Sequence, residues 1–110
     1  MWVKKGVIYN VSNQFGWDMS HAHVVSVDII DNGNILRFIF STRNNKNQCL
    51  PCYIDVKSSD FSLVKDISNK PLFDLGKIGT FDDCGIMPTW LLRLGNERWL
   101  YYIGWTVRNT

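Results

Sequence analysis

The sequence predicts an all-β fold in a single domain, and three observations support that prediction. Short segments rich in β-branched and aromatic residues recur along the chain and are separated by polar loops. Asn and Gly occupy two of the turns, at residues 31–34 and 95–96, as is typical of tight hairpins. No segment has the apolar periodicity of an amphipathic helix. A chain of 110 residues is long enough for one modest core.

Each expected element follows from its local pattern. Polar loops at residues 10–20, 44–48 and 68–83 separate the apolar segments. We expect Phe15 and Trp17 in the first loop to pack into the core. Pro51 marks an edge strand or the first residues of a strand, because proline cannot donate a ladder hydrogen bond. Strands are expected at residues 2–9, 22–30, 35–42, 50–57, 61–67, 86–94 and 98–106. The four strands from 22 to 67 would form an antiparallel meander, followed by a separate hairpin.

Composition excludes several classes of function. A formal charge of +2 with scattered basic residues argues against binding to nucleic acid. No run of eighteen apolar residues is present, which argues against a membrane span, and the amino-terminal residues lack the pattern of a secretory signal. The sequence therefore predicts a cytoplasmic protein, and no motif in it requires a cofactor.

The three cysteines are expected to be reduced, because an odd number cannot close a disulfide framework. Cys49 and Cys52 lie three apart in an expected strand, so they point to opposite faces, and no second pair completes a zinc site. Cys84 is expected to act as a small buried apolar side chain rather than as a reactive thiol. We predict no metal site.

The second hairpin repeats the first. When His21 is set against Cys84, the same offset aligns Ser26 with Thr89, Phe38 with Tyr101 and Phe40 with Ile103, while the turn glycines align after a slip of one position. Repetition of a four-stranded meander is typical of a β-propeller. The domain, residues 1–110, would then hold one complete four-stranded antiparallel blade at about 21–68 and the first hairpin of a second, incomplete blade at about 84–107.

The segments HAHVVSVDII, LRFIFSTRN, KPLFDLGKIGTFDDCGIMPTW and LYYIGWTVR resemble the amino-terminal part of five-bladed β-propeller proteins related to glycoside hydrolase family 43. The resemblance implies a central funnel in which a glycan binds. It places His21 at the start of the first innermost strand, Arg43 at the end of the next strand, and Asp82 at the acidic position before the following innermost strand. The sequence departs from the pattern at Val25, which stands where the later repeat has Pro88.

The resemblance makes Asp82 the catalytic candidate, and we expect His21, Arg43, Asp83 and Trp105 to bind the ligand. Glycoside hydrolysis usually needs two carboxyl groups facing each other across the bond. Asp83 follows Asp82 directly, and neighbouring side chains in an extended segment diverge. The resemblance implies a second carboxylate from a later blade, so we expect the isolated chain to be inactive as a glycosidase.

Each of these residues also has a structural interpretation. Asp82 is expected about equally to bind a ligand or to brace its own loop, as Asp commonly does in turns. Packing is favoured over a metal pair for His21 and His23, which lack a third ligand. An internal ion pair is favoured over a sugar carboxylate for Arg43, and a place in the core or between blades is favoured over a sugar platform for Trp105.

A blade has two large faces, and a chain that ends within the second blade would leave one face and one strand edge uncovered. We therefore expect the chain to form a homo-oligomer that buries them. The leading hypothesis is a non-catalytic, glycosidase-like partial propeller that assembles with itself and binds an oligosaccharide or glycoside. The alternatives are a glycoside hydrolase whose site is completed between subunits, and a protein-interaction module without a sugar ligand.

Overall fold

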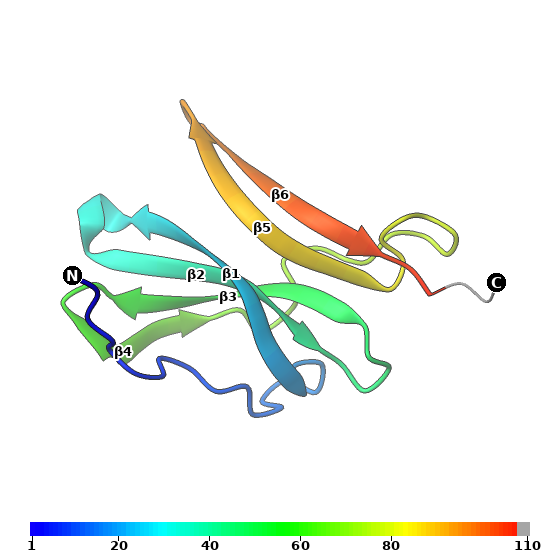
Figure 1. The fold of residues 1–110 in the computed structure, drawn as a ribbon, viewed down its shortest axis with the longest axis horizontal. Helices are drawn as coiled ribbons and strands as arrows, with labels where there is room; N and C mark the ends of the chain where they lie inside the picture. Colours follow the sequence, from blue (N-terminus) through cyan, green and yellow to red (C-terminus); the bar gives the residue numbers. More distant parts are fainter. Residues whose placement is uncertain (108–110) are drawn as a thin grey trace.

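The computed structural model describes residues 1–107, which fold into one six-stranded mixed β-sheet (Figure 1). The all-β prediction is confirmed, and six of the seven expected strands form close to their predicted bounds. They are β1 (Ser20–Ile30), β2 (Ile35–Arg43), β3 (Cys49–Lys57), β4 (Asp60–Ile67), β5 (Gly85–Leu94) and β6 (Glu97–Trp105), with a short 3₁₀ turn, η1 (Asp31–Gly33), between the first two. In this part of the chain, no helix has the length and apolar character needed to cross a bilayer.

The prediction of a strand at residues 2–9 is wrong. This segment has no regular structure, and Gly6 within it has a φ of 96°, outside the β region. Its apolar residues Ile8 and Tyr9 pack instead on the core cluster of the sheet. The segment therefore covers a face of the sheet with its side chains rather than adding a strand to an edge. Trp17 from the following loop packs on the same cluster, which confirms the prediction for this residue, whereas Phe15 stacks on Trp17 and is not among the residues that pack on the cluster.

The predicted meander and hairpin are both present. Strands β1, β2, β3 and β4 pair in sequence order and antiparallel. The β5–β6 hairpin joins the same sheet through a single parallel pairing of Cys49 on β3 with Gly85 on β5. Beyond this pairing the hairpin leaves the plane of the meander and crosses it at an angle (Figure 1). The architecture is thus an open sheet in which a hairpin lies over a four-stranded meander.

Different segments of the chain pack on the two faces of the meander. One face carries Phe40, Cys52, Ile54 and Val56, which form the buried apolar cluster beneath the amino-terminal segment. The opposite face is covered by β5, and the hydroxyl of Ser41 there donates a hydrogen bond to the backbone carbonyl of Ile86. The buried side chains of β2 and β3 therefore lie between the amino-terminal segment on one face and β5 on the other.

The alignment of the two hairpins by a single constant offset needs correction. The turn between the paired Ile30 and Ile35 is longer by two positions than the turn between the paired Leu94 and Glu97. When the turns are superimposed, Ile30 aligns with Leu94, whereas the constant offset would align it with Arg93. For β2 and β6 the constant offset is also wrong by one position, but in the opposite direction. Ile35 aligns with Glu97, whereas the constant offset would align it with Arg98. A shift of one position moves a side chain to the other face of a sheet.

Gly85 stands where the hairpin meets the meander, and we expect Gly85→Ala to destabilise the fold. Gly85 is buried, and an added Cβ would lie 1.7 Å from Nε1 of Trp105. The indole would have to move, at a cost of about 2 kcal/mol in the free energy of unfolding. Urea denaturation of both proteins measures this. Gly95→Ala at the exposed turn is the comparison: no atom lies within 4 Å of its added Cβ, so its cost comes from the positive φ of 59° alone, whereas the cost at Gly85 comes from the contact with Trp105.

Candidate functional site

One row of residues crosses the sheet at the end where β1, β3 and β5 begin. The pairings run from Ser20 to Arg43, from Arg43 to Cys49, from Cys49 to Gly85 and from Gly85 to Trp105. This row brings Arg43 and Trp105 to the same end of the sheet as His21, which follows Ser20 in the chain. Asp82 and Asp83 lie just before Gly85. The register therefore gathers all five predicted site residues at one end of the molecule.

The two histidines lie on the first residues of β1, where the strand is irregular. His21 has a φ of 58°, and its Nδ1 lies 2.8 Å from the hydroxyl of Ser20. The rings of His21 and His23 are 6.1 Å apart, and Nε2 of His23 lies 3.7 Å from Sγ of Cys49. Within residues 1–107, no group of three or more His, Cys, Asp and Glu side chains could hold a metal ion.

The environment of His23 lowers its pKa below the ordinary value of 6.5, chiefly because the ring is partly buried, and further because Arg43 and His21 place positive charge nearby. The unfolded chain therefore binds a proton at a higher pH than the folded protein does. Stability from neutral His23 is present above about pH 6.5 and is lost as the pH falls towards the folded pKa. We expect ¹³C or ¹⁵N NMR titration to find a lower pKa for His23 than the ordinary value. The Arg43→Gln variant should raise it, and a value unchanged by that substitution would contradict the assignment.

Arg43 ends β2 beside these rings. Its Nε is buried and has no hydrogen-bond partner in the part of the chain that the structure describes. The ion pairs found within residues 1–107 involve Arg37, Arg93 and Arg98 instead. An unpaired guanidinium donor is a group that could bind a carboxylate or hydroxyl of a ligand.

Asp82 braces its loop. Its carboxylate accepts hydrogen bonds from the hydroxyls of Thr80 at 2.9 Å and Tyr102 at 2.9 Å, and its side chain lies beside Gly104. The bond to Asp82 raises the pKa of Tyr102, with smaller effects from burial and from the charge of Asp82. Asp83 accepts a hydrogen bond from the backbone N–H of Gly79 at 2.8 Å. Both carboxylates therefore hold the loop that leads into β5.

Trp105 is half-buried, and its indole lies directly over the backbone of Gly85. This contact ties the last residue of β6 to the first residue of β5. Tyr101 on the same strand is more accessible, with 50% of its surface exposed. It lies on the side of the hairpin that faces away from the meander.

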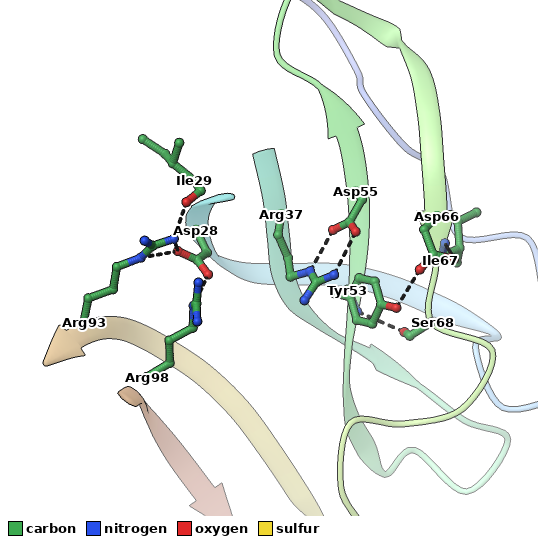
Figure 2. Close-up of polar contacts among 10 residues, drawn as sticks. All are labelled: Asp28, Ile29, Arg37, Tyr53, Asp55, Asp66, Ile67, Ser68, Arg93 and Arg98. Atoms are coloured by element: carbon green, nitrogen blue, oxygen red, sulfur yellow. Dashed lines mark hydrogen bonds and ion pairs between the residues drawn. The ribbon is translucent and has the colours of Figure 1, made fainter. Parts of the chain in front are cut away.

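A second cluster of charged residues lies at the opposite end of β1 and was not predicted from the sequence. Asp28 on β1 accepts hydrogen bonds from Nε and Nη2 of Arg93 on one oxygen and from Nε of Arg98 on the other, over distances of 2.6 to 2.9 Å (Figure 2). Arg93 also donates to the backbone carbonyl of Ile29. The Asp28 side chain is only 4% exposed, whereas the two arginine side chains are about half exposed.

A second ion pair continues along the same face of the meander (Figure 2). Arg37 binds Asp55 through two hydrogen bonds of 2.8 Å, and its guanidinium lies 4.2 Å from the centre of the Tyr53 ring. The hydroxyl of Tyr53 in turn donates to Asp66 at 2.8 Å. The polar groups of this face are thus linked in pairs that hold β2, β3 and β4 in register.

Comparison with known proteins identifies relatives without an assigned activity. Uncharacterized protein MT1551 of Mycobacterium tuberculosis (strain CDC 1551 / Oshkosh) and Uncharacterized protein Rv1502 of Mycobacterium tuberculosis (strain ATCC 25618 / H37Rv) are each 34% identical to this chain over 109 residues. The matched region is 99% of this chain and 36% of each relative, so the chain spans about a third of the length of these curated relatives. No family model matches the chain. No solved structure gives a significant match.

Proposed function

We propose that the chain is a glycosidase-like partial β-propeller that binds a carbohydrate without hydrolysing it and assembles with copies of itself. The observation that carries this proposal is the packing of β5–β6 over one face of the meander. Successive propeller blades pack face to face in this way, each blade contacting only its neighbours. The β1–β4 meander corresponds to the first blade, and β5–β6 corresponds to the first hairpin of the second.

The corrected alignment supports this correspondence. Ile39 lies on the face of the meander that β5 covers, and it is 7% exposed. Its counterpart on β6 is Tyr101, which lies on the far side of the hairpin and is 50% exposed. A rotation that carries the first blade onto the second would therefore place a further sheet over Tyr101. The exposed side of the hairpin is the side on which such a sheet would pack.

We define this exposed side as the outer face of the hairpin. Its apolar side chains are between 36% and 64% exposed, and they are Trp90, Leu92, Leu94, Trp99, Tyr101 and Ile103. Six large apolar side chains on one side of a two-stranded hairpin form a patch of the kind that marks an interaction site. A second copy of the chain is the partner that we propose, because such a copy carries the complementary blade faces.

The proposed carbohydrate site lies at the row that begins with Ser20 and ends with Trp105. Arg43 supplies a guanidinium group whose buried Nε has no hydrogen-bond partner within residues 1–107, and His21 supplies an exposed ring at the same end of the sheet. The carboxylate of Asp82 is already bonded to Thr80 and Tyr102, which suits a bracing role better than proton transfer to a leaving group. The site is therefore proposed to bind rather than to cleave.

Binding to a glycan array tests the carbohydrate proposal. We expect retention of one class of glycan by the wild-type protein and loss of retention in the Arg43→Gln variant, with Lys46→Gln on the neighbouring exposed loop as the matched control. Hydrolysis of aryl glycosides that is lost in Asp82→Asn would replace the binding proposal with the enzyme alternative. Absence of binding to any sugar would leave the interaction module, which the outer face supports.

A further inference from the structure

We propose that the cleft between the η1 turn and the tip of the β5–β6 hairpin binds a small anionic ligand through a carboxylate or phosphate group. A cavity of about 720 Å³ lies there, lined by Val27, Asp28, Leu91, Arg93 and Arg98 together with the η1 residues. It is at the opposite end of β1 from the proposed carbohydrate site and does not depend on that site. A volume of this size is typical of pockets for small molecules.

The charges around Asp28 leave a positive surplus on one wall of the cleft. Two guanidinium groups meet a single carboxylate, so that one positive charge is not balanced within the cluster. Arg37, the next arginine along this face, is matched one to one by Asp55 and contributes no surplus. The wall formed by Arg93 and Arg98 is thus the part of the cleft that attracts an anion.

Both arginines retain hydrogen-bond donors for a ligand. Arg98 contacts Asp28 through Nε alone, and Arg93 uses Nε and Nη2 for Asp28 and the backbone carbonyl of Ile29. Nη1 of Arg93 and both Nη groups of Arg98 make none of the hydrogen bonds found within residues 1–107. Because these side chains are 50% and 48% exposed, the remaining donors are accessible from the cleft. Guanidinium donors in this arrangement match the paired oxygens of a carboxylate or phosphate.

Asp28 fixes the two arginines before the ligand arrives. Its side chain is 4% exposed and holds both guanidinium groups at hydrogen-bond distance, so little side-chain freedom remains to be lost on binding. Val27 and Leu91 offer apolar contacts for the body of the ligand. Asp31 on η1 carries a negative charge on the opposite rim, which directs the anionic group of the ligand towards the arginine wall.

Titration of the full chain with inorganic phosphate and with D-glucuronate tests the proposal, with D-glucose as the neutral control. The measurement is the Nε–Hε NMR signal of each arginine, which reports on its own guanidinium group. We expect saturable shifts of the Arg93 and Arg98 signals, little change at Arg37, and no response to glucose. Shifts with phosphate alone would assign a phosphate ligand, and shifts with glucuronate alone would assign a carboxylate.

Variants distinguish a specific binding site from non-specific attraction of anions to a basic surface. We expect Arg98→Gln to weaken binding about tenfold, since Arg93 still bridges to Asp28 and keeps the hairpin in place. Asp31→Asn should strengthen binding by removing the opposing charge, and Lys46→Gln should leave it unchanged. Arg98→Lys, which keeps the charge but loses the planar fork, should fall between wild type and Arg98→Gln. Absence of saturable shifts, or equal weakening by Arg98→Gln and Lys46→Gln, would overturn the proposal.

Discussion

Replacing Asp28 with asparagine is expected to lower the free energy of unfolding by about 2 kcal/mol. The substitution keeps the size of the side chain but removes the carboxylate that Arg93 and Arg98 share. Removal of one partner from a fully buried ion pair costs about 3 to 5 kcal/mol. The expected loss is smaller because both arginines are about half exposed and water screens their charges.

Urea denaturation followed by tryptophan fluorescence measures this effect. Asp31→Asn is the matched control, because Asp31 is exposed and follows Asp28 by three residues. We expect the control to change stability by less than about 0.5 kcal/mol. Equal stabilities for Asp28→Asn and Asp31→Asn would show that the cluster does not hold the hairpin on the meander.

The stabilisation by Asp28 should also depend on pH. Burial by itself raises the pKa of Asp28, but hydrogen bonds from Arg93 and Arg98 and their charges outweigh it, so the folded pKa lies below the ordinary value of 3.8. A lowered carboxyl pKa contributes stability that is present above the unfolded pKa and is lost as the pH falls through the folded pKa. The difference between wild type and Asp28→Asn should therefore be largest near neutral pH and shrink below about pH 4.

A glutamate in place of Trp90 is expected to convert the proposed oligomer into monomers. Trp90 is 64% exposed on the outer face of the hairpin and pairs with Tyr101 across the two strands. Tryptophans at the centre of an interface commonly contribute about 2 kcal/mol or more, and a buried, unpaired carboxylate adds a further penalty. The dissociation constant for self-association should rise by at least about thirtyfold.

Size-exclusion chromatography with light scattering measures this change. Trp2→Glu is the control, because it introduces the same change at a fully accessible tryptophan, at 101% exposure, that lies outside the sheet. We expect Trp2→Glu to retain the oligomer. A wild-type chain that stays monomeric at micromolar concentration would contradict self-association and would favour a different occupant for the outer face.

Local signals in the sequence were sufficient for the strands and the turns. The polar turn at 31–34 and the Gly95-Asn96 turn lie between segments rich in β-branched and aromatic residues, and both hairpins form where these signals place them. The segment at 2–9 carries similar residues, but the packing of Ile8 and Tyr9 on the core cluster overrides its local preference for a strand. Composition alone does not distinguish a strand from an extended segment that covers a face.

The charged cluster could not be predicted in the same way. Arg93 and Arg98 lie 65 and 70 residues from Asp28, and they meet only because the hairpin crosses the meander at a particular angle. The alignment of the hairpins by one offset also set Tyr101 against Phe38, whereas the paired turns set it against Ile39 on the other face of the meander. Arg43 and Trp105 were both predicted to lie near the ends of strands. The register of the strands places these two residues at the same end of the sheet.

The environment of each strand cysteine also follows from the face of the sheet on which it lies. Cys49 and Cys52 lie three apart on β3 and point to opposite sides, as predicted, one beside His23 and the other in the apolar cluster. Burial raises the pKa of Cys52 to about 12, so its thiol stays protonated and unreactive. Cys84 is partly exposed, which corrects the expectation of a small buried apolar side chain.

A crystal structure of the chain in its assembled form tests the central proposal most directly, namely that β5–β6 is the start of a second blade. We expect the β1–β2 and β5–β6 hairpins to superimpose by a rotation about one axis, with the outer face of the hairpin buried against a sheet of the next copy. Hairpins that do not superimpose, or an outer face left bare in the assembly, would contradict the partial propeller and remove the basis for the carbohydrate site.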